Sequence, residues 1–359
     1  MKERGNHLLR FVDRYVGIPL VLLFSLRIKR KLPKKIESIA ILKSAGIGDL
    51  IFMSGVIQDI LKAHPRAKIW LFTGKANAAV GRMIEGVELV VLPMTNPIKT
   101  AKIIRNYPVD LWIDADPWPR ISTLLTLCSR SKFHIGFRTP KQMRHFPYDC
   151  TAQHSPKDHE IDSLRRLMVP LQIPTSSMPK LKVPAQKKRK LIVLHQFPGG
   201  SRANLKKWDK WQALANYFIK KGYRVVTTGG KEDVSTIKGV ENRVGLDSLE
   251  ETAKLVAQAF AVVTIDTGIL HLSAALGSYT IALHGPTFPH RCGGLGENVC
   301  AITPKIDYTP CIYLGFEAKC KSNNCMRAIT LTQVTEAFEK YESSCISRRE
   351  RDEALAHFA

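Results

Sequence analysis

The sequence lacks a long apolar run near its N-terminus, where a signal or a membrane anchor would lie. The run that is present, "YVGIPLVLLFSL" at residues 15–26, holds only about twelve residues, whereas a spanning helix needs roughly 20. No small-residue cleavage site follows it, which argues against a secretory signal. We therefore expect neither a spanning helix nor a cleaved leader here.

The chain has 8 cysteines but no two of them in the close C-x₂-C spacing typical of a zinc site. Cys292, Cys300, Cys311, Cys320 and Cys325 gather in the C-terminal third, but their spacings miss the paired C-x₂-C pattern of zinc ribbons. A chain of 359 residues also needs no disulfide framework to fold. We predict reduced cytosolic thiols and no metal site.

Acidic residues are few beside the basic ones, 31 against 54, which gives a net charge of +23. Such a charge favours acidic partners, namely nucleotides, nucleic acid or an anionic membrane surface. The basic residues are spread along the chain, and we find no recognition helix and no aromatic stacking platform. Nucleic acid is therefore not the expected partner.

The N-terminal segment combines apolar and basic residues. Residues 8–14, "LLRFVDR", have the mixture of an interfacial helix, and "RIKRKLPKK" at 27–35 suits anionic headgroups. One interpretation is a helix packed on the protein's own surface; the other, which we favour, is attachment to one face of a membrane. On the second interpretation, residues 1–32 are dispensable for folding.

The rest of the chain alternates strands and helices, and its length suits two domains. The pattern predicts an α/β fold of two Rossmann-like lobes with mostly parallel sheets. Between about residues 138 and 185 the chain turns polar and rich in proline, and we place the boundary between the lobes near residues 172–188. The predicted parts are a membrane-associating segment 1–35, an N-terminal Rossmann-like lobe 36–172, a linker 173–188, a C-terminal Rossmann-like lobe 189–340 and a polar tail 341–359. The expected strands are 38–43, 68–73, 87–92, 108–116 and 133–137, then 190–197, 223–230, 261–266 and 280–285.

A glycine turn, Gly46-Ile47-Gly48-Asp49, follows the first expected strand. A dinucleotide site would need a third glycine at Ile51 and would not place a carboxylate against a pyrophosphate. Asp49 has two interpretations: a helix N-cap, or a general base exposed on the turn that takes a proton from a substrate. Gly46 and Gly48 would let a bulky acceptor or donor approach the backbone closely.

A second turn, "DTGILH" at 266–271, follows a strand of the second lobe. Thr267 and Gly268 are predicted to open a helix whose N–H groups hold a phosphate, with His271 leaning back toward them. The alternative is Asp266 as an N-cap beside a histidine on a helix face. Lys206, after another strand on the same edge, would neutralise a leaving diphosphate.

Two further acidic positions follow strands. Glu232 comes after "TTGG", where an acidic residue hydrogen-bonds ribose hydroxyls; an ordinary surface glutamate is equally compatible. Asp114-Ala115-Asp116 has the D-x-D form of metal-dependent glycosyltransferases, but the triplet is common by chance. We do not favour metal binding there.

Taken together, the motifs resemble a known family. "ILKSAGIGDLIFMSGVIQDILKAHP", "GGSRANLKKWDKW", "TIDTGILHLSAALG", "IALHGPT" and the tail "KCKSNNCMRAIT" are similar, in order and spacing, to the bacterial heptosyltransferases, glycosyltransferase family nine. The resemblance covers roughly residues 36–340. It implies the GT-B fold, two Rossmann-like lobes facing across a cleft, and inverting chemistry without metal or cofactor. Members typically use ADP-heptose to build the lipopolysaccharide core.

Residue by residue, the resemblance implies a catalytic base at Asp49 and a diphosphate-binding lysine at Lys206. The family's donor loop matches the stretch from Asp266 to His271, whereas Glu232 matches only loosely. One position departs: many members have phenylalanine before Gly-Pro-Thr, where this chain has His284, which puts the identity of the sugar in doubt.

The expected function is therefore transfer of a sugar from a nucleotide-sugar to an anionic glycolipid. The expected location is cytoplasmic, peripheral on the inner membrane. Two alternatives remain. A sugar-nucleotide epimerase of similar fold would need acid–base residues around the donor sugar itself, and a nucleic-acid-binding protein would bind with steep salt dependence.

Overall fold

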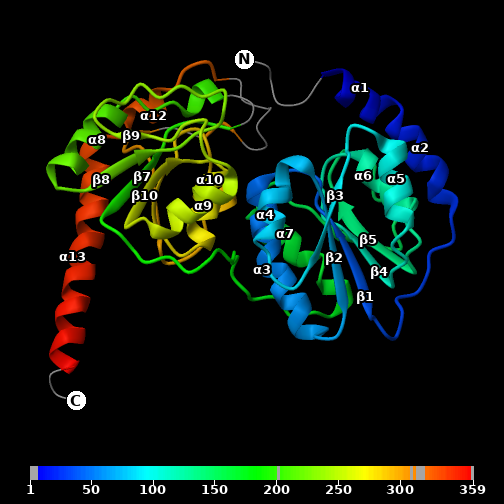
Figure 1. Cartoon of the computed structure of the whole chain (residues 1–359). Helices are drawn as coiled ribbons and strands as arrows, with labels where there is room; N and C mark the ends of the chain where they lie inside the picture. Colours follow the sequence, from blue (N-terminus) through cyan, green and yellow to red (C-terminus); the bar gives the residue numbers. More distant parts are fainter. Residues whose placement is uncertain (1–6, 200–202, 308–309, 313–319, 357–359) are drawn as a thin grey trace. The chain divides into compact units, whose positions relative to one another are not determined.

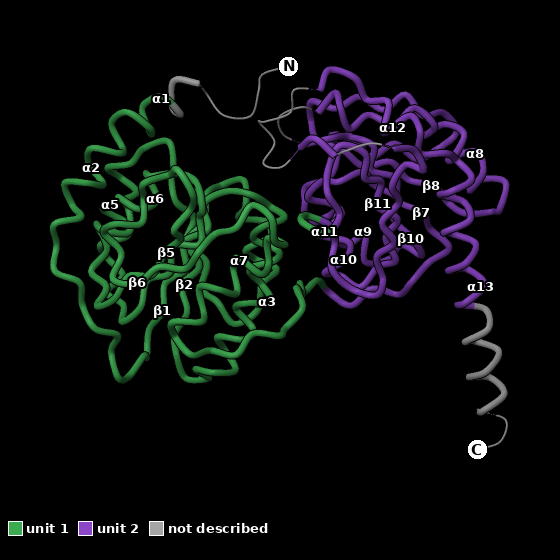
Figure 2. Tube along the Cα trace, turned by 180° about the vertical axis from the view of Figure 1, so that it is seen from behind, with its two compact units in different colours: residues 1–183, 290–292 green, residues 184–289, 293–359 purple. Residues whose placement is uncertain are grey.

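The computed structural model describes residues 7–199, 203–307, 310–312 and 320–356, and the side chains of residues 7–10 and 346–356 are left aside (Figure 1). The chain divides into two compact units (Figure 2). Unit 1 comprises residues 1–183 and 290–292, and unit 2 comprises residues 184–289 and 293–359. The division after residue 183 lies inside the predicted linker 173–188. Each unit is described by itself.

Unit 1 is built on a parallel six-stranded sheet of order β3-β2-β1-β4-β5-β6, the order of a Rossmann fold. All the strands expected before residue 138 are present. β6 was not predicted, because this short edge strand is only partly buried and shows no apolar alternation. The strands are β1 (Ser38–Leu42), β2 (Lys68–Gly74), β3 (Glu88–Leu92), β4 (Leu111–Asp114), β5 (Phe133–Arg138) and β6 (Cys150–Gln153).

Helices cover both faces of this sheet (Figure 1). On one face Ile104 and Leu125 pack on Ala40, Phe72 and Trp112 of the strands. Near-continuous burial of the strands is what a parallel sheet covered on both sides requires. The helices are α3 (Ile47–Ala63), α4 (Ala78–Arg82), α5 (Pro97–Arg105), α6 (Arg120–Leu127) and α7 (Glu160–Arg166), with short 3₁₀ turns η2 (Lys75–Asn77) and η3 (Val169–Leu171).

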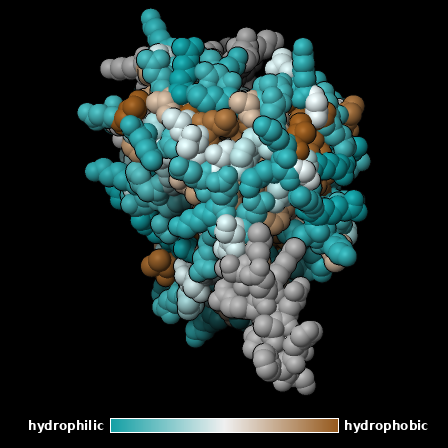
Figure 3. Space-filling view, turned by 90° about the vertical axis from the view of Figure 1, so that its left-hand side faces the viewer, coloured by the Kyte–Doolittle hydropathy of each residue, from teal (hydrophilic) through white to brown (hydrophobic). Residues whose placement is uncertain are grey.

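Unit 2 repeats the plan with a second parallel sheet of order β12-β11-β10-β7-β8-β9. Phe218 and Phe338 pack on strand residues such as Val263 in its core. The face on view in Figure 3 is mainly hydrophilic. The strands are β7 (Leu191–His195), β8 (Arg224–Thr227), β9 (Glu241–Asn242), β10 (Ala261–Ile265), β11 (Tyr279–Leu283) and β12 (Val299–Ile302). The helices are η4 (Ala203–Lys206), α8 (Trp211–Lys220), α9 (Leu249–Gln258), α10 (Gly268–Ala275), α11 (Pro289–Cys292, grouped largely with unit 1), α12 (Asn324–Ala328) and α13 (Leu331–Ala356).

The residues predicted as a polar tail continue α13 as far as Ala356; residues 357–359 lie outside the described part. Tyr341 stacks on Tyr279 with ring centroids 3.7 Å apart. Glu342 pairs with Lys221 at 2.5 Å and accepts a hydrogen bond from the Tyr223 hydroxyl at 2.6 Å. Tyr341 and Glu342 therefore anchor the first part of this charged stretch to unit 2.

The N-terminal segment forms α1 (His7–Tyr15), α2 (Gly17–Leu23) and η1 (Phe24–Leu26), and α1 and α2 both contact α6. Val21 is fully buried, and a Cβ on Gly17 would lie 3.0 Å from the Arg120 Cβ. Packing on the protein's own surface, the interpretation we ranked second, is thus present. None of the described helices is both long and apolar enough to cross a membrane.

Asp13 ties this segment to unit 1 by capping α6. Its Oδ1 accepts hydrogen bonds from the Arg120 N–H at 2.8 Å and the Ile121 N–H at 3.0 Å. Its Oδ2 pairs with the Arg120 guanidinium at 3.0 Å. The N-cap residue itself, Pro119, makes no side-chain cap. Removing residues 1–32 would therefore take away the cap of α6, and whether the rest of the chain folds without them stays a prediction.

Replacing this cap should destabilise unit 1 measurably. We expect Asp13→Ala to lower the free energy of unfolding by about 2 kcal/mol, because two helix N–H groups and the mostly buried Arg120 lose their acceptor. Thermal unfolding should show a fall in Tm of about 4–8 °C. Asp162→Ala is a matched control, since it breaks an exposed pair with Arg165 and should cost under about 1 kcal/mol. Equal Tm values for both variants would contradict the capping role.

Candidate active site

The glycine turn of unit 1 shapes the start of α3. Gly46 is the N-cap, with φ 89° and no side-chain cap. A Cβ at this position would lie 2.6 Å from Asp49 Oδ2, so both the backbone and the space demand glycine. Asp49 is the third residue of the helix, which makes the N-cap interpretation wrong. Its negative charge still favours the first turn of a helix.

A buried lysine holds the Asp49 carboxylate. Lys43 follows β1 directly, is only 3% exposed, and its Nζ lies 3.2 Å from Asp49 Oδ2 and 2.9 Å from Asp116 Oδ1. Asp116 Oδ2 also accepts a hydrogen bond from the Ser44 N–H at 2.9 Å. The Asp49 side chain is 38% exposed. The turn therefore presents the accessible carboxylate of Asp49, and the buried ammonium group of Lys43 fixes its orientation.

Sequence reasoning missed Lys43, although it carried a signal. A lysine that directly follows four buried residues of a parallel strand lies at the carboxyl edge, where such sheets place their ligands. Burying an ammonium group there is costly unless carboxylates surround it. Asp116 supplies the buried partner, which leaves Asp49 as the partner that faces outward.

The surrounding groups raise the pKa of both Asp49 and Lys43. This disfavours the charged form of Asp49 and favours the charged form of Lys43. The pKa of Asp49 is raised above 3.8, chiefly because the surrounding protein displaces water, with the negative charges of Glu160 and Asp116 adding to the effect and Lys43 opposing it. The pKa of Lys43 is raised despite its burial, because Asp116 and Asp49 stabilise the ammonium form. A carboxylate of raised pKa is a stronger proton acceptor than an ordinary aspartate.

The carboxylates of the Asp114-Ala115-Asp116 triplet are turned to partners within unit 1. Asp114 Oδ2 accepts hydrogen bonds from Arg144 at 2.5 Å, Tyr148 at 2.6 Å and Ser122 at 2.9 Å, while Asp116 binds Lys43. Within the residues that the structure covers, no group of three or more His, Cys, Asp or Glu is placed to hold a metal ion. The triplet acts here as an acceptor for protein cations.

In unit 2 the predicted phosphate turn begins α10. Thr267 is its N-cap, and the Thr267 Oγ1 accepts a hydrogen bond from the Ile269 N–H at 3.3 Å. The alternative that made Asp266 the N-cap is therefore wrong. Gly268 is the first helical residue, and His271 lies one turn further, 7% exposed. The turn has the geometry of an anion-binding helix start.

Lys206 reaches this turn from η4. Its Nζ donates to the Asp266 backbone carbonyl at 2.9 Å and lies 2.8 Å from Asp266 Oδ2. Burial would raise the pKa of Asp266, but Lys206 and His284 together hold it well below its usual range. The structure thus brings Lys206, Asp266 and the α10 N-terminus together. The preceding Gly200, Ser201 and Arg202 of the same motif lie outside the described residues.

His284, the position at which the sequence differs from the family pattern, lies near Asp266 in the same cluster. It is fully buried, its Nδ1 is 3.1 Å from the Thr287 Oγ1, and its Nε2 has no hydrogen-bond partner among the described residues. Burial lowers the pKa of this imidazole, while the nearby carboxylate of Asp266 opposes that shift. His284 therefore adds a polar atom where many members of the resembling family have an apolar ring.

Glu232 is exposed on the turn after β8, and the structure does not bring it to Lys206 or α10 through any described contact. The turn is organised by its neighbour Asp233, whose Oδ2 accepts the Gly230 N–H at 2.7 Å. A ribose contact for Glu232 stays a prediction.

Comparison with known sequences points to one family. The family model described as "Glycosyltransferase family 9 (heptosyltransferase)" matches residues 98–321. The chain is 33% identical over 131 residues to lipopolysaccharide heptosyltransferase 1 of Pseudomonas aeruginosa, covering 34% of this chain and 36% of that protein. It is 30% identical over 119 residues to lipooligosaccharide heptosyltransferase 2 of Haemophilus influenzae, covering 29% and 34%. These matches span little more than a third of the relatives' own lengths.

Solved structures share the fold over nearly their whole length. The family 9 glycosyltransferase of Veillonella parvula superposes with a TM-score of 0.70 at 17% identity, covering 87% of this chain and 98% of that one. An ADP-heptose lipopolysaccharide heptosyltransferase II of E. coli gives 0.67 at 18% identity, covering 85% and 98%. The fold is thus GT-B, with two Rossmann-like lobes. Because the family model matches more than half of the residues of this chain, the chain belongs to glycosyltransferase family 9, the heptosyltransferases.

Proposed function

We propose that this protein is an inverting, metal-independent glycosyltransferase. It transfers a sugar, heptose from ADP-heptose, to a lipopolysaccharide core or a related anionic glycolipid. The observation that carries the proposal is the exposed Asp49 carboxylate, which Gly46 leaves room for and Lys43 orients. Membership of family 9 supports the reaction class. It does not favour the epimerase or the nucleic-acid-binding alternative.

In the proposed reaction, an acceptor hydroxyl attacks the anomeric carbon of the donor sugar. The new C–O bond forms as the bond to the nucleoside diphosphate breaks, and Asp49 takes the hydroxyl proton. Negative charge develops on the leaving diphosphate. Lys206 and the N–H groups at the start of α10 stabilise that charge. No metal is needed, because the ammonium group and the helix terminus supply the positive potential.

Lys206 is held in place by a residue of its own unit. Its ammonium pairs with Asp266, which fixes the position of the lysine beside the start of α10. A preorganised cation loses little conformational freedom on binding a phosphate. His284 lies beside the same carboxylate and is proposed to help select the donor.

The location that fits this acceptor is the cytoplasmic face of the inner membrane. Beyond the residues packed on α6, α1, α2 and the following chain leave large apolar side chains exposed, and basic residues follow directly at 27–35. Such a surface suits attachment to one anionic leaflet. The most exposed are Phe11, Tyr15, Leu23, Leu26 and Ile28.

Donor binding is the simplest test of the proposal. ADP-heptose should raise the thermal stability of the full chain, by about 2.7 kcal/mol at a concentration of about 100 times Kd. ADP-glucose, which shares the nucleotide, should stabilise less, and UDP-N-acetylglucosamine, which shares neither part, should have no effect. Stabilisation by the UDP-sugar alone would contradict the proposed donor.

A further inference from the structure

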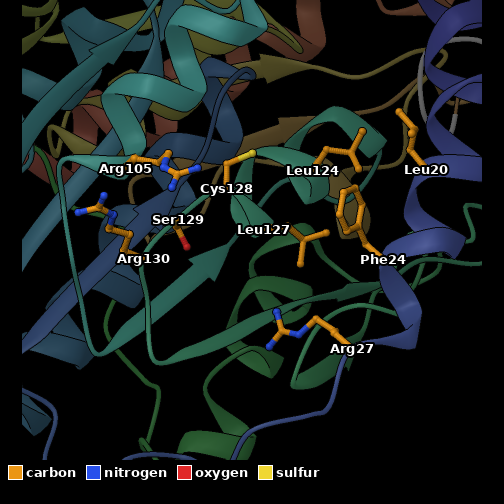
Figure 4. Close-up of a pocket in the computed structure, with 9 residues that line it drawn as sticks. All are labelled: Leu20, Phe24, Arg27, Arg105, Leu124, Leu127, Cys128, Ser129 and Arg130. Atoms are coloured by element: carbon orange, nitrogen blue, oxygen red, sulfur yellow. The ribbon is translucent and has the colours of Figure 1, made fainter.

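A cavity of about 520 Å³ lies in unit 1 between the N-terminal segment and α6, within the size range of pockets that bind small molecules. Figure 4 shows its two ends. Leu20 and Phe24 from α2 and η1, together with Leu124 and Leu127 of α6, line one end. Arg105 and Arg130 lie at the other. The cavity thus joins an apolar compartment to a basic rim.

The two arginines at the rim are exposed, and no acidic residue of the described chain pairs with either side chain. Arg27, which also borders the cavity, differs. Its guanidinium is 2.5 Å from Asp149 Oδ1 and 2.8 Å from His134 Nδ1, so it fastens the segment to the sheet. Arg105 and Arg130 therefore carry uncompensated charge available to an anion.

The cavity does not belong to the candidate active site. Arg105 precedes β4 and Arg130 precedes β5, which places both at the amino ends of these parallel strands. Asp49 follows the carboxyl end of β1. The cavity and the proposed base therefore lie at opposite edges of the same sheet, and an acceptor hydroxyl bound at Asp49 is not in the cavity.

The surroundings of the cavity indicate what enters it. Leu20 is 37% exposed and Phe24 is 49% exposed, so the apolar end opens to solvent. Leu26 and Ile28, 84% and 90% exposed, extend that apolar surface along the chain. A large apolar opening with an adjacent basic rim is complementary to a molecule that has a hydrocarbon chain and a negative headgroup.

We propose that this cavity binds one anionic phospholipid. Its acyl chain contacts Leu20, Phe24, Leu124 and Leu127, and its phosphate lies between Arg105 and Arg130. The site fixes one lipid of the leaflet on which the exposed apolar residues rest. It does not depend on the proposed transfer reaction, because none of its residues belongs to the donor or the base turn.

Vesicle sedimentation tests the basic rim. The full chain should pellet with vesicles of phosphatidylglycerol and phosphatidylcholine, and much less with phosphatidylcholine alone. Removing both arginines, as Arg105→Gln with Arg130→Gln, should weaken binding about tenfold or more, because each basic group near an anionic surface contributes on the order of 1 kcal/mol. The matched control, Arg66→Gln with Lys102→Gln, removes the same charge from exposed positions of unit 1 and should cost less than half as much on a logarithmic scale. Equal losses would show nonspecific attraction and overturn the site.

Protection of Cys128 tests the cavity itself. Cys128 borders the cavity and is partly exposed, so its alkylation by N-ethylmaleimide, followed by peptide mass spectrometry, reports occupancy. Monomeric lysophosphatidylglycerol should slow the reaction at least fivefold, with no change at Cys320. Inorganic phosphate and lysophosphatidylcholine should not protect. Equal protection by inorganic phosphate would indicate a phosphate site without a lipid. No protection by the lysolipid would leave the cavity without its proposed occupant. Either result overturns the proposal.

For the arginine variants of the sedimentation experiment, unaltered Tm values would show that they fold.

Discussion

Asp49→Asn is expected to reduce sugar transfer by about a hundred- to ten-thousandfold, the usual contribution of a general base. Asparagine keeps the size of the side chain but cannot take the acceptor proton. Stability should change little, because the lost pair with Lys43 is partly exposed and the lost helix-dipole interaction is worth about 0.3–1 kcal/mol. Initial rates with donor and acceptor, measured beside the affinity for ADP-heptose and the Tm, separate these effects.

The pH profile provides the control for this variant. The wild-type rate should rise with pH as Asp49 loses its proton, with a midpoint above 3.8 because the pKa of this carboxyl is raised. Residual activity of Asp49→Asn should lack that rise. An asparagine variant with near-normal turnover and an unchanged profile would remove Asp49 from the role of base.

Lys206→Ala is expected to damage both folding and donor binding. The ammonium group is bound to Asp266, and the two side chains are only 12% and 10% exposed. Removing one partner of a buried pair costs about 3–5 kcal/mol. A lost contact to phosphate is worth about 1.5–3 kcal/mol, or about ten- to a hundredfold in kcat/KM. From sequence alone, only the second effect would be expected.

The double variant Lys206→Ala with Asp266→Asn separates the two effects, because it leaves no buried charge unpaired. It should recover most of the stability and still bind ADP-heptose weakly. The folded-state pKa of Asp266 is lowered, so its stabilising contribution is present above about pH 4 and is lost on further acidification. The double variant should lose that acid dependence. Wild-type donor affinity in the double variant would show that Lys206 only supports the fold.

The sheets and turns were predictable from sequence because their physics is local. The central strands are short apolar runs, unlike the edge strands β6 and β9. Glycine follows β1 where the backbone needs a positive φ at Gly46. The capping box that Ser248 and Glu251 form at the start of α9 is a local pattern of the same kind. A residue pair three positions apart suffices to specify that helix start.

The features that the sequence did not predict depend on contacts between residues far apart in the chain. Asp13 caps a helix more than a hundred positions later, and no local pattern marks such a partner. Lys43 gains its role only where β1 and β4 lie side by side and bring Asp116 next to it. Tyr341 of the predicted tail is anchored in the same way, by Tyr279 of a distant strand.

We propose that this chain transfers heptose to a glycolipid with Asp49 as the base. The most direct measurement incubates the full chain with ADP-heptose and a lipopolysaccharide core lacking heptose, and follows ADP release together with the acceptor mass. We expect the wild type to add heptose and release one ADP for each sugar transferred. Asp49→Asn should bind ADP-heptose and leave the acceptor unchanged. Transfer by the asparagine variant at a rate near that of the wild type, or an acceptor left unmodified by a wild-type protein that binds the donor, would contradict the account.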